Sequence, residues 1–113
     1  MDIQNLIKKI KTSPESVSFK EVIETIDNHY IYQPAEFVNG ETINQAGTNE
    51  GSCKIFAFAQ LHQLDSNETL NCFGDYYRED VLRYPDNNDH ANIRQFMIHG
   101  WDGIHFKKKP LSS

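Results

Sequence analysis

The segment IFAFA, residues 55–59, is apolar at every position and follows directly on the polar run NEGSCK. In a helix, consecutive apolar residues cover the whole circumference, and such a helix has to be buried on more than one face. We therefore predict a central buried helix over Cys53–Leu64, with Ser52 as its N-cap. A chain of 113 residues has material for one core, so the other elements must pack around this helix in a single domain, residues 1–113.

Helix start signals are present before and after the central segment. Asp2 precedes apolar residues at three- and four-residue spacing. Ser18 with Glu21, and Asp65 with Glu68, form the capping-box pattern in which a small polar residue is followed three positions later by Glu. These patterns predict one helix at the N-terminus, a second from Ser18 and a short one over ETLNCF.

Two further helices are predicted in the C-terminal half. DYYREDVLRY reads as a helix that Pro85 stops, because proline cannot continue a helix. HANIRQFMIH reads as another, with Asp89 as its N-cap and Gly100 as its terminator.

The segment between the second and the central helix indicates a β-hairpin. Pro34 rules out a continuous helix here, and Asn39-Gly40 is a strong hairpin signal because both residues tolerate positive φ. The sequence predicts strands near residues 34–38 and 41–45.

The segment WDGIHFKK alternates polar residues with apolar Ile104 and Phe106, so it is expected to add a strand to the hairpin. The expected fold is α+β: a single compact domain of about five helices around the central buried helix, with a small antiparallel sheet made of the hairpin and the C-terminal strand.

The charge balance excludes one class of partner. Eleven Lys and Arg residues stand against 16 acids, for a net charge of −5, so there is no electrostatic case for binding nucleic acid, whose phosphates require many clustered Lys and Arg residues. From Glu21 to Cys53 there is no Lys or Arg, which indicates either a solvated acidic face or a docking surface for a basic partner. Two cysteines indicate free thiols of a reducing compartment, and no segment is long and apolar enough to span a membrane.

Four stretches together resemble the HopJ type III effector family: SPESVSFKEVIETIDNHY, Glu50–Ala59, FGDYYREDVL and DHANIRQFMIHGWDGIHF. The resemblance runs from about Leu6 to Phe106 and is most distinctive at Gly51–Lys54 and Gly74–Arg78. It implies a bacterial protein, resident in the cytoplasm or exported into a host cell by type III secretion. The family brings no established enzymatic activity, so it assigns no catalytic residue to this chain.

Cys53 has three interpretations. At a helix N-terminus beside Lys54, its thiol pKa would fall, and a downstream histidine, above all His105, would complete a small thiol-dependent hydrolase or transferase. Alternatively, Cys53 lies on a core stripe with residues 57, 61 and 64 and is structural. A third interpretation is a cytoplasmic small-anion binder at the Ser52–Lys54 helix start.

The segment GDYYRED concentrates side chains that anchor protein interfaces. Tyr76 and Arg78 are expected to point away from the core face that Tyr77 and Val81 occupy, which makes them candidates for a recognition patch. The plainer alternative is that both tyrosines pack and Arg78 pairs locally with an acid, Asp75 or Asp80.

No metal site or cofactor is expected. The run DNNDH has the one-three-five spacing of a calcium loop, but Ala91 and Met97 stand where that loop needs glycine and glutamate. Trp101 is expected to bury its rings and donate its N–H to a carbonyl.

The leading functional hypothesis is a type III effector-like, non-enzymatic module that binds a protein partner. The candidate ligand-binding residues are Ser52, Cys53, Lys54, Tyr76 and Arg78.

Overall fold

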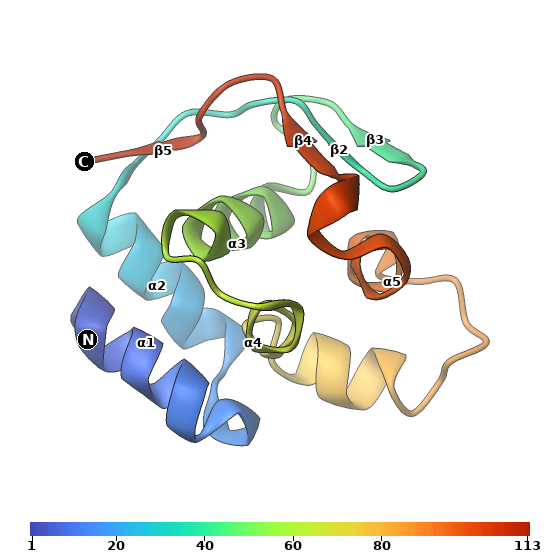
Figure 1. The fold of residues 1–113 in the computed structure, drawn as a ribbon, viewed down its shortest axis with the longest axis horizontal. Helices are drawn as coiled ribbons and strands as arrows, with labels where there is room; N and C mark the ends of the chain where they lie inside the picture. Colours follow the sequence, from blue (N-terminus) through green and yellow to red (C-terminus); the bar gives the residue numbers. More distant parts are fainter.

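Helix α3, Glu50–Leu61, runs through the middle of the molecule in the computed structural model, which describes all residues from 1 to 113 (Figure 1). Phe56 and Phe58 both lie wholly inside the core although they point to different sides of the helix. The predicted central helix is therefore confirmed, and it is enclosed by the other helices on one side and by the strands on the other.

The start of α3 differs from the prediction. The N-cap is Asn49, which adopts a left-handed conformation with φ of 49°, and the N–H of Cys53 already donates to the carbonyl of Asn49 at 3.0 Å. Asparagine tolerates this conformation better than most residues, so the helix begins at Glu50. Ser52 therefore lies inside the first turn, and its predicted role as the N-cap is wrong.

The other helices lie where the start signals placed them. The N–H of Asn5 donates to the Asp2 carboxylate, and both predicted capping boxes make their two reciprocal bonds. The helical elements are α1 (Ile3–Thr12), η1 (Pro14–Ser16), α2 (Phe19–His29), α4 (Ser66–Asn71), η2 (Tyr76–Val81), α5 (Ala91–His99) and η3 (Gly100–Gly103).

Two details of the C-terminal helices depart from expectation. The segment over DYYREDVLRY is helical only as the short π-helical element η2. Asp89 does not cap α5, because its carboxylate holds the Arg94 guanidinium at 2.7 Å. The N-cap is His90, again in a left-handed conformation, with φ of 52°.

The C-terminal strand joins the hairpin, as predicted. β2 (Phe37–Asn39) is the middle strand of an antiparallel sheet, with β3 (Thr42–Asn44) on one side and β4 (Ile104–Phe106) on the other. Asn39 pairs with Thr42, so the two-residue turn is Gly40–Glu41, one position later than the Asn39-Gly40 signal suggested. Glycine with positive φ at the first turn position is what a type II′ turn requires.

Asn39 is kept in the strand by a buried amide network. Its side-chain amide donates to the carbonyl and side-chain oxygens of Asn92, at 2.8 and 3.0 Å. Asn44 and Asn92 exchange side-chain hydrogen bonds of 3.0 and 2.9 Å, and Asn49 donates to Asn44 at 2.7 Å. The network connects the sheet to the starts of α3 and α5, and no local pattern in the sequence predicts it.

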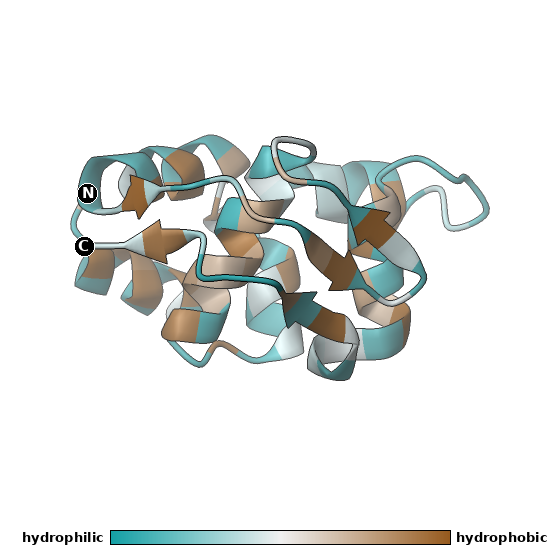
Figure 2. Cartoon of the chain, turned by 90° about the horizontal axis from the view of Figure 1, so that it is seen from above, coloured by the Kyte–Doolittle hydropathy of each residue, from teal (hydrophilic) through white to brown (hydrophobic).

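A second pair of strands was not predicted. β1 (Ile31–Tyr32) and β5 (Leu111–Ser112) run antiparallel and bring the C-terminus beside the end of α2 (Figure 1). Seen from above, the strands form one layer across the helices (Figure 2).

Phe56 is the packing centre of these layers. Its ring centroid lies 6.1 Å from that of Phe37 on the sheet, 5.4 Å from Phe73 after α4 and 5.0 Å from Phe96 on α5. Trp101 meets it edge-on at 6.4 Å. The sheet, the turn after α4, α5 and η3 therefore all contact a single side chain of α3.

We predict that Phe56→Ala lowers the free energy of unfolding by about 3–5 kcal/mol, because it leaves a cavity that several layers border. The measurement is urea denaturation followed by circular dichroism. Ile98→Ala is the control: Ile98 is 70% exposed on α5 and should change stability by no more than about 0.5 kcal/mol. Equal losses in the two variants would contradict the central position of Phe56.

Candidate functional site

The Cys53 thiol is enclosed. Its side chain is 1% exposed, and the sulfur makes a weak 3.9 Å contact with the carbonyl oxygen of Ala35. Burial raises the pKa of Cys53, and this outweighs the lowering effect of the hydrogen bond from Tyr32. The thiol is therefore protonated at neutral pH, as the structural interpretation expects.

No histidine is hydrogen-bonded to that sulfur. His90 binds the carboxylate of Asp80 at 2.9 Å, and His105 is exposed on β4 opposite Val38. A thiolate–imidazole pair of the kind that cysteine nucleophiles use is not assembled.

The stripe on which Cys53 lies is not buried along its full length. Ala57 and Leu64 lie in the core, but Leu61 is 44% exposed. Leu61 is the last residue of α3, and there the helix lines an open groove beside β4 and β5. The expectation that the stripe faces the core throughout the helix is wrong at this position.

The three residues Ser52, Cys53 and Lys54 do not converge on one site. The Lys54 ammonium lies 2.9 Å from the Asp27 carboxylate and 4.8 Å from the ring centroid of Tyr32. Ser52 lines a cleft with other partners. The N–H groups without an intrahelical partner belong to residues 50–52, since that of Cys53 is already bonded to Asn49.

The structure instead brings Ser52 together with Tyr76. Both line a cleft of about 450 Å³ between the starts of α3 and α5. Tyr76 is 44% exposed, and its ring stacks edge-on against Phe19 at 5.1 Å and tilted against His90 at 5.2 Å. On its other side Tyr76 borders a second cleft of about 530 Å³, which Arg78 also lines. Tyr76 thus forms a ridge between two hollows.

Two glycines permit this arrangement around Phe19. A Cβ atom at Gly51 would lie 2.8 Å from the Phe19 ring, and one at Gly74 would lie 2.7 Å from the Phe19 backbone nitrogen. The distinctive stretches Gly51–Lys54 and Gly74–Arg78 therefore meet at one residue, Phe19. Phe19 and His90 were not predicted as neighbours of Tyr76. The glycines at positions 51 and 74 are the local features of the sequence that indicate a close approach to Phe19.

Arg78 holds the backbone together beside the second cleft. Its guanidinium donates to the carbonyl oxygens of Pro14 at 3.0 Å and Asn71 at 3.2 Å, and also to that of Val17. These bonds join η1 to the end of α4. The expected local pairing with Asp75 or Asp80 is wrong, because backbone carbonyls from distant segments take the guanidinium donors.

The acidic stretch between Glu21 and Cys53 is largely neutralised. Four of its acids lie within 4 Å of a lysine: the pairs are Glu21–Lys9, Glu24–Lys20, Asp27–Lys54 and Glu36–Lys107. Glu41 and Glu50 of this stretch have no lysine within 4 Å, so the acidic surface available to a basic partner is reduced to these two side chains and the exposed parts of the pairs.

Three further observations concern Trp101, metal ligands and the helices. The Trp101 indole N–H donates to the carbonyl of Leu64 at 3.0 Å, as expected. No group of three His, Cys, Asp or Glu side chains is placed to hold a metal ion. None of the helices combines the length and apolarity that crossing a membrane requires.

The fold and these side chains define a small α+β domain with an exposed tyrosine ridge and an enclosed, protonated thiol. The chain belongs to the HopJ type III effector protein family, whose model matches residues 3–111. A crystal structure of the unknown-function protein VPA0580 is 49% identical and superposes with a TM-score of 0.98, covering 99% of this chain and 93% of that one. No curated protein matches the sequence.

We predict that native Cys53 reacts with iodoacetamide at pH 7.5 only as fast as the protein unfolds, because the sulfur is buried and protonated. Mass spectrometry of peptides from a labelling time course measures the rate. Cys72 is an internal control, since it is fully buried and its pKa is raised to about 12. Rapid labelling of Cys53 while Cys72 stays intact would point to the thiol enzyme.

We predict that Arg78→Met costs about 2–3 kcal/mol of stability, because it leaves backbone carbonyls near η1 and α4 without their charged donor. Arg78→Lys should recover only part, since one ammonium cannot span these acceptors. Arg83→Met is the matched control, because Arg83 makes only an exposed pair with Glu79. Thermal denaturation of the three variants decides: equal melting temperatures for Arg78→Met and Arg83→Met would contradict a structural role for Arg78.

Proposed function

We propose that this HopJ-family protein is a non-enzymatic binding module that recognises a protein partner through the ridge formed by Tyr76. The observation that carries the proposal is the exposed Tyr76 ring, held by Phe19 and His90 between two clefts. A rigid aromatic side chain loses little conformational entropy on binding and offers both apolar area and a hydroxyl, which is why tyrosine is frequent at interface hot spots.

The surroundings of Tyr76 suit an interface anchor. Its neighbours Ser52 and Asn92 line one cleft and Lys20 lines the other, so polar groups border the ring on both sides. Arg78 stiffens the backbone below the ridge through its bonds to Pro14 and Val17. A partner side chain entering either hollow would contact the ring without requiring the backbone to rearrange.

The thiol-enzyme alternative has weaker support. Cys53 would have to reach solvent, lose its proton and gain a histidine partner, and its burial and raised pKa oppose the first two steps. The small-anion alternative also has weaker support, because Lys54 is paired with Asp27 and Glu50 places a carboxylate in the first turn of α3.

The family supplies the setting for the proposal. HopJ proteins are described as type III effectors, so we propose that the protein is made in the bacterial cytoplasm and exported by type III secretion to meet a protein of the host cell.

The test is site-specific photocrosslinking with benzoylphenylalanine at position 76. Tyr84 is the matched control, since it is another exposed tyrosine, 58% accessible, and lines neither cleft. We expect a discrete crosslinked species in host-cell extract from position 76 and not from position 84. Excess unlabelled protein should compete it away, whereas excess Tyr76→Ala protein should not.

Two results would contradict the proposal. The first is equal crosslinking from both positions, which would indicate non-specific contact. The second is competition by Tyr76→Ala as effective as that by the unsubstituted protein, which would mean that the tyrosine ring contributes nothing to recognition. Circular dichroism of Tyr76→Ala confirms in either case that the competitor is folded.

A further inference from the structure

Strand β4 leaves one edge of the three-stranded sheet without a partner. The sheet order is β3–β2–β4, so β4 pairs only with β2. Two hydrogen bonds bracket the pairing: Lys107 N–H to the carbonyl of Glu36 at 3.0 Å, and Gly40 N–H to the carbonyl of Gly103 at 3.0 Å. Along an antiparallel strand, the backbone N–H and C=O groups of successive residues point alternately to one neighbouring strand and to the other side. The backbone groups of His105 therefore point to β2, whereas those of Ile104 and Phe106 point to the free edge.

Three backbone groups remain available on this edge. The N–H of Ile104 donates a hydrogen bond to the carbonyl of Trp101 and is not available. The carbonyl of Ile104 and both backbone groups of Phe106 make no bond outside the sheet. They are spaced as one repeat of an antiparallel or parallel ladder, which is what an added strand requires.

A groove of about 430 Å³ runs along the free edge. Its apolar wall is formed by Ala57 and Leu61 of α3 and by Leu111, while Ile104 and Phe106 supply the strand side. Leu61, which is only partly buried, contributes apolar surface that is exposed to solvent. An extended chain in this groove would pair with β4 through its backbone and place alternate side chains against Leu61.

The groove carries an unpaired positive charge in an acidic protein. Lys108 and Lys109 line it and are exposed, and neither lies within 4 Å of a carboxylate, whereas the neighbouring Lys107 pairs with Glu36. The whole chain has a net charge of −5, so this local excess of cations is opposite in sign to the charge of the protein as a whole. An approaching carboxylate is attracted to these two ammonium groups.

We propose that the β4 groove binds an extended, acidic peptide segment by strand addition. The segment would pair its backbone with Phe106, place an apolar side chain on Leu61 and set carboxylates beside Lys108 and Lys109. This surface is separate from the Tyr76 ridge and is a second binding site, so its success or failure does not depend on the ridge.

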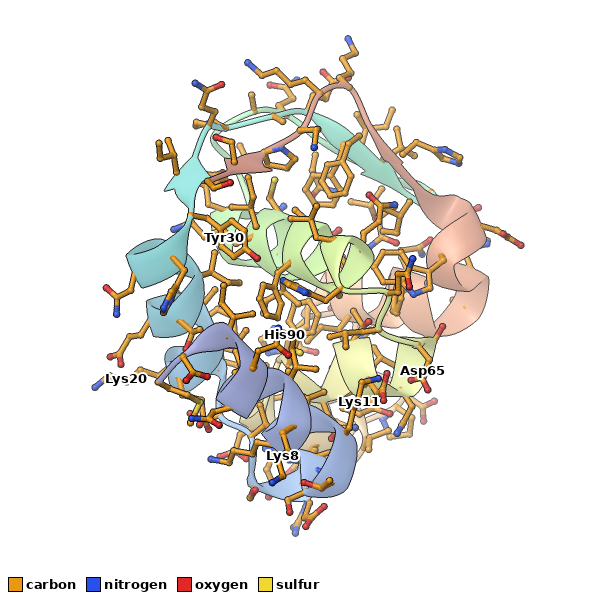
Figure 3. All side chains as sticks on the ribbon, turned by 60° about the vertical axis from the view of Figure 1, so that its left-hand side comes forward. Lys8, Lys11, Lys20, Tyr30, Asp65 and His90 are labelled. Atoms are coloured by element: carbon orange, nitrogen blue, oxygen red, sulfur yellow. The ribbon has the colours of Figure 1, made fainter.

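The experiment uses the full chain and a fluorescein-labelled peptide, acetyl-Thr-Val-Thr-Val-Glu-Glu-amide, in a fluorescence anisotropy titration at low salt. We expect saturable binding that weakens by about tenfold in the double variant Lys108→Glu/Lys109→Glu, where ion pairing is replaced by repulsion. Lys8→Glu/Lys11→Glu changes the net charge by the same amount on α1, on the far side from the sheet layer, and should bind as the unsubstituted protein does (Figure 3).

A second peptide separates strand addition from simple charge attraction. The same sequence with N-methyl groups on alternate amides keeps its carboxylates but cannot form a ladder, and we expect it not to bind. Amide hydrogen exchange should slow at Phe106 with the first peptide only.

Three outcomes would overturn the proposal. Equal binding of the two peptides would reduce the site to a charged patch. Equal weakening in both charge-reversal variants would show that only net charge matters. A concentration-dependent dimer of the free protein, detected by sedimentation and abolished by Lys108→Glu/Lys109→Glu, would assign the groove to a second copy of this chain, since free sheet edges also pair with one another.

Discussion

The burial of one phenylalanine ring holds the layers of this protein together. Phe56 contacts an aromatic side chain from the sheet, from the turn after α4, from α5 and from η3. The strands are only two or three residues long, and sheets of that size are not stable alone in water. They persist because their inner face, through Phe37, packs on a helix whose middle segment, residues 55–59, is buried around its whole circumference. The sheet therefore depends on α3 rather than the reverse.

The amide network sets the register of that packing. Asn39 and Asn44 of the sheet bind Asn92 of α5, so a shift of the hairpin by one residue would leave several buried amides without partners. Such a loss costs far more than one apolar contact, because a buried unpaired polar group forfeits its hydration. Packing on Phe56 fixes which face of the sheet is buried, and the asparagines fix where along the strand it lies.

Whether a feature could be predicted from the sequence depends on how far apart in the chain the interacting residues lie. The central helix, the capping boxes and the added strand β4 rest on spacing within a few residues, and the sequence predicted them. The N-cap of α3 and the hairpin turn each lie at another position than the sequence predicted. The reason is that Asn39 and Asn49 belong to a hydrogen-bond network that joins distant segments. The contacts of the candidate site could not be predicted for the same reason. The hydrogen-bond partners of Arg78 include backbone carbonyls up to 64 positions away in the sequence, which no local pattern encodes.

The course of α3 also explains why binding is better supported than chemistry. At its N-terminal end the helix passes beneath the segment that leads into β2, and the carbonyl of Ala35 closes over the Cys53 sulfur. At its C-terminal end the helix is not fully covered by β4 and β5, so Leu61 borders an open groove. The Cys53 sulfur is covered by the segment that leads into β2, whereas Leu61, the free backbone of β4 and the two lysines border an open groove. These are groups that can bind a peptide chain.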